Sequence, residues 1–368
     1  MKTPISSNLF RLSPVQVTQI RFGFVLCAAL ITHFACSETE PSNKVAEIQA
    51  ASESNRIEQG EPLVVYSGRG AVLIEPLLNE FTQKTQIPIE VRYEKSTQTL
   101  ANRIATEADQ TQADVFFAQD SGWLGALDEA GHLAVLNDDL LGRVPEHNRA
   151  KNGTWVGTSG RARVLVYSPE RISIEDLPDR LADLPKVAPP GRVGWAPGNG
   201  SFQAHVSALR HIWGEEQTQS WLEQMNALEP KVYPKNSPQV KGVSNGEIDI
   251  GWVNHYYLHK LRSSSPGLEA ANYSFREKGD AGNLMMLSGV GVISHSDNQK
   301  AAEAFVDFLL SDDAQSYFAN KTFEYPTVPG IELHEDVPFI DEKINRANQE
   351  HLTDLSGTLD VLRRVGLQ

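Results

Sequence analysis

Two adjacent tyrosines, Tyr256 and Tyr257, are the side chains of this sequence whose spacing is best suited to chemistry. A phenolate oxygen is a hard anionic ligand that suits a hard cation such as ferric iron. Because the pKa of an ordinary tyrosine is about 10, the phenol is protonated at neutral pH, and a highly charged cation beside it favours the ionised form. The pair is therefore a candidate metal clamp. The alternative is that both rings only pack, at a surface or between lobes.

The element before the tyrosines decides whether both phenols can reach one ion. The apolar run 248–253 is typical of a buried strand. Successive side chains of a strand point to opposite faces. We therefore expect the backbone to leave strand geometry at 254–257, at a junction between a strand and a helix. His255 and His259 are spaced to hold a metal on that helix, but we favour a solvated helix face for them.

Other chemical motifs are sparse. The sequence contains no HExxH, GxSxG or GxxxxGK[ST] motif, and no nucleophile, base and orienting group stand at a recognisable spacing. This argues against an enzyme. The loop 197–201 turns into a predicted helix, whose free N–H groups could cradle an anion, and the alternative is a simple turn with a helix cap.

Composition narrows the class of protein. The chain has 368 residues, of which 40% are hydrophobic and 22% are charged, as in an ordinary globular protein of two or three domains. Its net charge of -14 argues against a nucleic-acid partner, which would call for a basic patch.

The N-terminal region 1–36 has the pattern of an export signal. Basic residues precede an apolar run at 22–31 that is short for a membrane span. Cys36 follows a small residue and could carry a lipid anchor, and the alternative is a cleaved form without an anchor. Both cysteines lie in this leader, which excludes disulfides, thiolate metal sites and cysteine nucleophiles from the folded part. We expect the mature protein to work outside the cytoplasm, with a polar linker at 37–61.

After the linker, strand and helix patterns alternate. Predicted strands lie at 63–66, 87–93, 113–117, 163–167, 192–195, 248–253 and 289–293, and predicted helices lie around 73–81, 100–108, 221–228 and 301–310. Such alternation predicts an α/β fold, and the first stretch at 63–117 predicts a mainly parallel sheet with helices on its faces. Ligands of such sheets bind outside the carboxyl ends of the strands, where the loop before the tyrosines would lie.

Taken together, these segments resemble the periplasmic ferric-iron-binding proteins of ABC importers, which have the type II periplasmic binding protein fold. The resemblance runs from about 63 to 330 and rests on the order and spacing of several motifs. The motifs are VYSGR at 65–69, ADVFFAQ at 113–119, SGRARV at 159–164, KNS at 235–237, NGEID at 245–249, NHYY at 254–257 and EYPTVPG at 324–330.

The resemblance implies two α/β lobes that are joined by two crossing strands and close on a hinge over a ligand cleft between them. The first lobe would comprise 62–158 and 286–330, and the second lobe 159–285. C-terminal helices at 331–368 would pack on the second lobe. The implied protein is a monomeric substrate-binding component that delivers its cargo to an ABC permease of the inner membrane.

The resemblance also assigns roles to residues. Tyr256 and Tyr257 match the pair that ligates iron, so the implied ligand is Fe³⁺ with phosphate or carbonate as a synergistic anion. The positions implied to hold the anion are Arg161, Asn199, Gly200, Asn236 and Asn254. Further candidates for the wall of the cleft are Ser67, Arg69 and Gln119.

Two departures from the family pattern leave the cargo open. Gly70 stands where many members have a histidine, and Gln119 stands where many have a glutamate. Candidates to replace these ligands are Asp120, Glu94 and Tyr66. The alternative cargo is a phosphonate, thiamine, a polyamine or a similar small solute on the same fold, and Arg69 with Arg161 could clamp a phosphonate.

Overall fold

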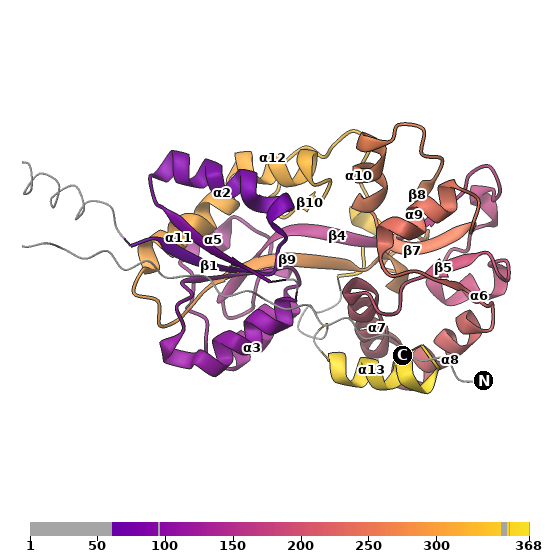
Figure 1. Cartoon of the computed structure of the whole chain (residues 1–368), viewed down its shortest axis with the longest axis horizontal. Helices are drawn as coiled ribbons and strands as arrows, with labels where there is room; N and C mark the ends of the chain where they lie inside the picture. Colours follow the sequence, from indigo (N-terminus) through magenta and orange to yellow (C-terminus); the bar gives the residue numbers. More distant parts are fainter. Residues whose placement is uncertain (1–60, 95, 347–351, 353, 368) are drawn as a thin grey trace, which may run out of the picture. The chain divides into compact units, whose positions relative to one another are not determined.

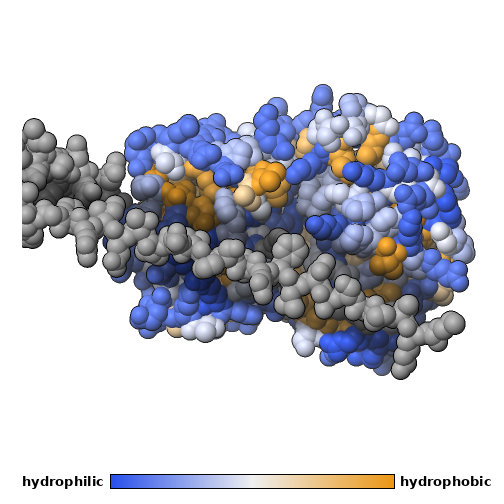
Figure 2. Space-filling view, in the orientation of Figure 1, coloured by the Kyte–Doolittle hydropathy of each residue, from blue (hydrophilic) through white to orange (hydrophobic). Residues whose placement is uncertain are grey.

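The computed structural model describes residues 61–94, 96–346, 352 and 354–367. The predicted export signal, with Cys36, and the predicted linker up to residue 60 lie outside the described residues. Among the helices that are described, none is long and apolar enough to cross a membrane. Figure 2 shows that the visible face of the described chain is mostly hydrophilic, as expected where amphipathic helices turn their apolar sides inward.

The first lobe is built around parallel strands flanked by helices (Figure 1). Its elements are β1 (Leu63–Ser67), α2 (Ala71–Thr85), β2 (Ile89–Tyr93), α3 (Thr97–Glu107), β3 (Val115–Ala118), α4 (Gly122–Glu129), α5 (Asp138–Gly142), α11 (Gln299–Leu309), α12 (Asp312–Lys321) and β10 (Tyr325–Pro326). Strand β1 pairs in parallel with β2 and with β3.

The second lobe repeats the pattern with shorter strands. Its elements are α6 (Leu184–Val187), β5 (Val193–Trp195), α7 (Gly200–Trp213), α8 (Glu215–Asn226), β6 (Lys231–Val232), α9 (Asn236–Ser244), β7 (Ile250–Asn254), α10 (Tyr256–Ser264) and β8 (Ala271–Tyr273). Strand β5 pairs in parallel with β6 and with β7.

Two long strands, β4 (Trp155–Tyr167) and β9 (Met285–Val292), connect the two groups of elements (Figure 1). They pair with each other in antiparallel fashion, and the second half of β4 pairs antiparallel with β7. The resulting strand order is β2-β1-β3-β9-β4-β7-β5-β6. The parallel pairing predicted for the first stretch of the ordered chain is confirmed by β1, β2 and β3, whereas the middle of the sheet is antiparallel, because the chain enters the second lobe along β4 and returns along β9.

Strand β4 begins at Trp155, well before the predicted strand at 163–167. Its first half contains Gly157 and Gly160, which weaken the sequence signal of a strand. Tertiary packing requires these glycines. A Cβ atom at Gly160 would lie 2.7 Å from Sδ of Met285, and one at Gly157 would lie 3.0 Å from the carbonyl oxygen of Asn148.

The apolar cores follow the lobes. Phe81, Phe117 and Phe305 pack in the core of the first lobe, with edge-to-face contacts of 5.2 Å between the rings of Phe81 and Phe305 and 6.3 Å between those of Phe117 and Phe305. In the second lobe, Trp195 and Trp252 pack with helices α7 and α8.

The C-terminal part of the described chain has two regions. Val337, Ile340 and Ile344 pack in the same apolar cluster as Met285 and Tyr256. Helix α13 (Leu355–Arg364) packs on α7 and α8, next to each other in Figure 1, and its Val361, Leu362 and Val365 enter the core of the second lobe.

We predict that Phe305→Ala lowers the free energy of unfolding of the first lobe by about 3–5 kcal/mol, because a buried aromatic ring is lost and its cavity collapses only in part. Urea titration followed by tryptophan fluorescence and circular dichroism measures the change. The matched control is Val72→Ala in α2, where the side chain is 84% exposed, and it should change the free energy by about 0.5 kcal/mol or less. Equal effects of the two substitutions would contradict this account of the core.

Candidate functional site

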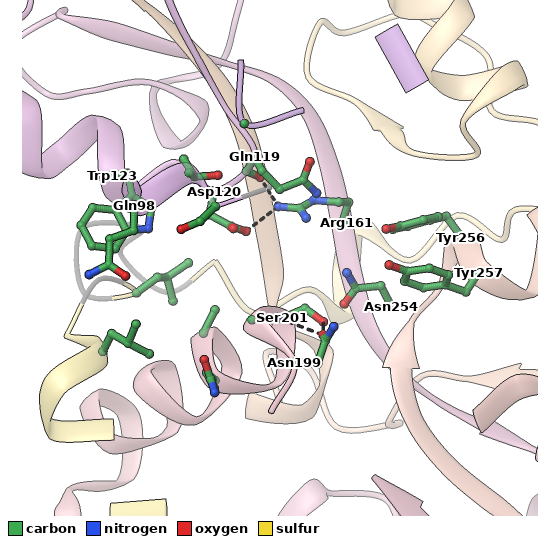
Figure 3. Close-up of a pocket in the computed structure, with 18 residues that line it drawn as sticks. Gln98, Gln119, Asp120, Trp123, Arg161, Asn199, Ser201, Asn254, Tyr256 and Tyr257 are labelled. Carbon is green, nitrogen blue, oxygen red and sulfur yellow. Dashed lines mark hydrogen bonds and ion pairs between the residues drawn. The ribbon is translucent and has the colours of Figure 1, made fainter. Parts of the chain in front are cut away.

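A cavity of about 480 Å³ is lined by residues of both lobes (Figure 3). Tyr256 and Tyr257 form part of its wall. The other predicted site residues that line it are Gln119, Arg161, Asn199, Gly200 and Asn254. Residues of the first lobe come from the segments after β1 and β3 and from the starts of α3 and α4, and those of the second lobe come from β4, the start of α7 and the junction of β7 with α10. The cavity therefore lies at strand ends and helix N-termini, as expected for an α/β sheet.

The two tyrosines lie at the predicted junction between a strand and a helix. Strand β7 ends at Asn254 and α10 begins at Tyr256, so the backbone turns at His255. The two rings stack with centroids 4.3 Å apart and an angle of 28° between them. Figure 3 shows both hydroxyl groups pointing to the same side, toward Arg161 and Asn254. This geometry lets two phenols reach one cation.

Tyr256 is buried, with 6% of its surface exposed. Burial raises the pKa of the Tyr256 phenol well above its ordinary value, and a negative charge on Tyr257 would raise it further, while Arg161 acts in the opposite direction. The phenol of Tyr256 is therefore protonated in the absence of a metal. A highly charged cation can reverse this preference, so the pair is suited to an ion that competes strongly for the phenolate.

The predicted solvated face for His255 and His259 is wrong, since both side chains are buried. Nδ1 of His255 accepts a hydrogen bond from the N–H of Ala162 at 3.1 Å, and its Nε2–H donates to the carbonyl oxygen of Phe323 at 2.7 Å. Burial lowers the pKa of His255 to about 3, so the ring is neutral. His255 thus holds the start of α10 against β4 and the segment after α12.

The predicted anion cradle corresponds to the N-terminus of α7. Oδ1 of Asn199 caps the helix by accepting from the N–H of Ser201 at 3.1 Å and from its hydroxyl at 2.6 Å. Asn236 does not line the cavity, but its amide donates to Oδ1 of Asn199 at 3.3 Å and to Oγ of Ser201 at 3.1 Å. A Cβ atom at Gly200 would meet nothing within 4 Å, which leaves the helix N-terminus open to a ligand.

Arg161 lines the cavity and is paired with an acidic residue. Its Nη2 donates to Oδ1 of Asp120 at 2.7 Å and to the carbonyl oxygen of Gln119. Burial disfavours the guanidinium, but Asp120, Tyr256 and Glu324 outweigh that effect and raise the pKa of Arg161. The charge of Arg161 is therefore already balanced by Asp120 before any ligand binds.

Two residues predicted for the wall of the cleft, Ser67 and Arg69, do not line the cavity. Arg69 is fully buried and forms an ion pair with Glu324 at 2.8 Å, and Ser67 donates to the carbonyl oxygen of Arg69 at 3.0 Å. Since its guanidinium is occupied by Glu324, Arg69 cannot clamp a phosphonate together with Arg161. Nη1 of Arg69 also holds Oε1 of Gln119 at 3.2 Å, and Gln119 does line the cavity.

The candidates for replacement ligands differ in their placement. Asp120 lines the cavity. Tyr66 is fully buried, and its hydroxyl accepts from Nη1 of Arg92 at 3.0 Å and donates to Glu107 at 3.4 Å, so it is turned away. Glu94 is exposed and lies outside the cavity wall. Gly70 precedes α2 and does not line the cavity either.

Several residues of the wall were not predicted. They are Gly68, Ser96, Thr97, Gln98, Trp123, Gln203, Ala204, Leu352 and Leu355, whereas Ser201 belongs to the predicted cradle at 197–201. Ser96 caps α3, a role that a serine before a helical pattern could have suggested. Arg163, directly behind the wall, was also missed, although a charged residue at the start of an otherwise apolar strand is a visible signal.

Within the described ranges, no group of three or more histidine, cysteine, aspartate or glutamate side chains is arranged to hold a metal ion. Tyr256 and Tyr257 are not of these types. A cation in the cavity would therefore depend on the two phenols, on Asp120, and on ligands that come with the cargo.

Comparisons with known proteins show which families and folds this chain is similar to. The family of bacterial extracellular solute-binding proteins matches residues 66–316. The chain is 32% identical over 267 residues to the Fe(3+)-binding periplasmic protein of Serratia marcescens, which covers 72% of this chain and 78% of that protein. Its fold is similar to that of iron-bound HitA from Pseudomonas aeruginosa, with a TM-score of 0.76 and 31% identity over 83% of this chain and 99% of that chain.

A further similar structure is that of IdiA (FutA) from Trichodesmium in complex with iron and citrate ligands, with a TM-score of 0.73 and 26% identity over 83% of this chain and 100% of that chain. These similarities confirm the predicted two-lobe periplasmic binding protein fold.

We predict that Glu324→Gln lowers the free energy of unfolding by about 3–5 kcal/mol, because Arg69 then keeps an unpaired charge in the core. The control is Asp313→Asn, which removes an exposed partner of Lys84 and should cost about 0.5 kcal/mol or less. Urea titrations of both variants measure the difference. A result for Glu324→Gln as small as that of the control would contradict a structural role for the buried pair.

The same pair predicts a pH dependence. Burial would raise the pKa of Glu324, but Arg69 outweighs it and lowers this pKa below the ordinary value of 4.5. A carboxyl group whose pKa is lower in the folded state stabilises the fold above its ordinary pKa, and this stability is lost as the pH falls through the folded pKa. Wild type should therefore lose more stability than Glu324→Gln between about pH 5 and pH 2. Parallel acid titrations of the two proteins test this, and parallel curves would exclude it.

Proposed function

The chain belongs to the family of bacterial extracellular solute-binding proteins, and from this premise we propose that it is the ferric-iron-binding component of an ABC importer. The family consists of solute-binding transport proteins and not of enzymes, in agreement with the sparse catalytic motifs of the sequence. The observation that carries the proposal is the pair of stacked phenols that faces one cavity beside an anion cradle.

The proposed cargo is Fe³⁺ held by Tyr256 and Tyr257 together with a synergistic anion. Tyr256 is the first residue of α10, where the partial positive charge of the helix N-terminus favours a phenolate. Asn199, Gly200 and Asn254 would hold the anion, which supplies the oxygen ligands that Gly70 and Gln119 do not. Phosphate, carbonate or a larger carboxylate fits this role.

Closure of the lobes would complete the site. The wall contains Gln119 and Asp120 from the first lobe and the tyrosines from the second, so a ligand that contacts both lobes favours the closed state. Strands β4 and β9 are the natural hinge, because they connect the lobes. We take the lobes to be 62–158 with 286–330, and 159–285.

The proposed location is the periplasm, which fits the export-signal pattern at 1–36 and the periplasmic relative from Serratia marcescens. A lipid on Cys36 would anchor the mature protein to the membrane. The proposed partner is the inner-membrane permease of the importer, to which a monomer would deliver iron.

A second candidate function is the binding of a small phosphorylated or other organic solute without iron. The observation that favours it is the cavity wall, where Gln119 is neutral and Asp120 is already paired with Arg161. Calorimetry with phosphonates, thiamine and polyamines in the presence of a strong iron chelator separates the candidates. Tight binding under these conditions would support the organic solute.

We predict that wild-type protein with Fe³⁺ and phosphate develops a visible phenolate-to-iron charge-transfer band. The double variant Tyr256→Phe, Tyr257→Phe should lack the band and bind iron at least about 100-fold more weakly, because losing even an outer partner of a metal ligand costs 10–100-fold. Tyr233→Phe is the control, since its ring is buried at a distance from the cavity and its hydroxyl contacts Glu247. A band that survives in the double variant would contradict the assignment of the two tyrosines as iron ligands.

We also predict that Gln119→Glu strengthens iron binding by about tenfold, or about 1.4 kcal/mol. One carboxylate oxygen would stay on Arg69, as Oε1 of Gln119 does now, and the other would face the cavity. Iron competition against citrate measures the affinity. The control Gln98→Glu adds the same charge elsewhere on the first-lobe wall. An equal gain in affinity in both variants would show that net charge, and not the position of residue 119, causes the effect.

A further inference from the structure

Arg163 lies directly behind the anion cradle and is fully buried. Its Nη1 donates to Oδ1 of Asn254 at 2.9 Å and to Oγ of Ser201 at 3.3 Å. Its Nη2 donates to the carbonyl oxygen of Trp252 at 2.9 Å, and its Nε donates to Nδ1 of His205 at 3.3 Å. Asn254 and Ser201 line the cavity, so the guanidinium is one hydrogen bond away from a bound ligand.

In the described part of the chain, the hydrogen-bond partners of Arg163 are all neutral. His205 is neutral because burial and the charge of Arg163 lower its pKa well below the ordinary value, and its Nε2–H donates to the carbonyl oxygen of Ala281 at 2.6 Å. The other arginines near the site differ, because Arg69 pairs with Glu324 and Arg161 pairs with Asp120. Arg163 is thus the buried cation of this region without a carboxylate.

An unpaired charge in a protein interior is costly, and such charges are normally paired. Burial lowers the pKa of Arg163 to about 9, which still leaves it charged at neutral pH. The guanidinium also lies over the ring of Trp252, at 5.2 Å from its centroid, which partly replaces the lost hydration. The charge that would balance it is an anion in the cavity.

Arg163 also orients the cavity wall. Because Oδ1 of Asn254 is held by Arg163, the amide nitrogen of Asn254 is left to face the cavity, and Figure 3 shows this side chain between the tyrosines and Asn199. Oδ1 of Asn199 is likewise occupied by Ser201 and Asn236. Both amides therefore offer N–H donors to a ligand, which suits an oxyanion.

We propose that Arg163 makes the cradle select a doubly charged oxyanion over a singly charged one. This rests on the proposed function. Ferric iron with two phenolates carries one net positive charge, and Arg163 adds a second, while Arg161 and Arg69 are balanced by their carboxylates. A dianion such as hydrogen phosphate or carbonate makes the closed site neutral. Arg163 is thus a positioning residue that sets the charge of the anion accepted with the metal.

The test compares variants that separate the charge of Arg163 from its packing. Arg163→Lys keeps the charge, whereas Arg163→Gln keeps hydrogen-bond donors and removes it. Asn254→Asp leaves Arg163 in place and gives it a carboxylate that balances its charge. This variant tests the same point if Arg163→Gln does not fold. Arg171→Gln is the control, because Arg171 pairs with Asp249 at 2.6 Å outside the cavity wall.

Full-length protein with Fe³⁺ at pH 7.5 is titrated with inorganic phosphate, mostly a dianion there, and with dimethyl phosphate, a monoanion of the same chemistry. The readout is the ratio of the concentrations that produce half of the visible band. In Arg163→Gln and Asn254→Asp, the preference for phosphate over dimethyl phosphate should be about tenfold smaller than in wild type. This is the size of one charge interaction in a partly buried site. Arg163→Lys and Arg171→Gln should stay within about twofold of wild type.

If Arg163 had only a structural role, its loss would lower the thermal midpoint and the affinities for both anions, but the ratio of the two affinities would stay the same. An unchanged ratio in Arg163→Gln and Asn254→Asp therefore overturns this proposal, while the proposed function of iron binding would still stand. If wild type shows no band with either anion, the proposed function fails instead. Calorimetry of iron-free protein with phosphate then decides the role of Arg163. Equal phosphate affinity in wild type and Arg163→Gln would refute it, and a loss of about tenfold would support it.

Discussion

The antiparallel pairing of β4 with β9 is the constraint on which the rest of the structure depends. The register places Arg161 opposite Met286 and Ala162 opposite Met285, at the point where the chain passes from one lobe to the other. Each lobe has parallel strands of its own, but both are attached to this pair. The cavity forms beside it because the strand ends of the two lobes meet there. The glycines of β4 and β9 permit the close contacts that this crossing needs.

The alternation of side chains along β4 distributes charge between the lobes. Arg161 and Arg163 are two residues apart and share one face of the strand. Arg161 reaches Asp120 of the first lobe, and Arg163 reaches Asn254 of the second. A shift of one residue in the register would turn both arginines to the other face and remove the donors from the cradle. In the proposed function, β4 would therefore serve both as a hinge strand and as part of the binding site.

Charge balance connects the departures from the family pattern with the site. The first lobe contributes a neutral Gln119 whose side-chain oxygen Oε1 accepts a hydrogen bond from Arg69, and the charge of Arg69 is itself balanced by Glu324. The wall of the first lobe thus adds little net charge. Binding would then depend on the phenols and on an anion that binds together with the metal. Because burial raises the pKa of Tyr256, only a cation of high charge would favour its phenolate form.

The sequence by itself determined the local elements and the chemistry of the tyrosine pair. Local elements can be predicted because they depend on residues that are neighbours in the sequence. Examples are the apolar run Leu63–Ser67, the helix pattern of Ala71–Thr85 and the turn before Tyr256. The motifs and their order were sufficient for the two-lobe fold, which the comparisons confirm.

Only the tertiary structure decided which polar side chains are free to bind a ligand. Arg69, Arg161 and Arg163 look alike in the sequence, but Glu324, Asp120 and Asn254 are distant along the chain, and they give the three arginines different roles. The burial of His255 and the antiparallel middle of the sheet depend on the same long-range pairing. Partners brought together from distant segments cannot be read from local spacing, because they follow from how the two crossing strands place the lobes.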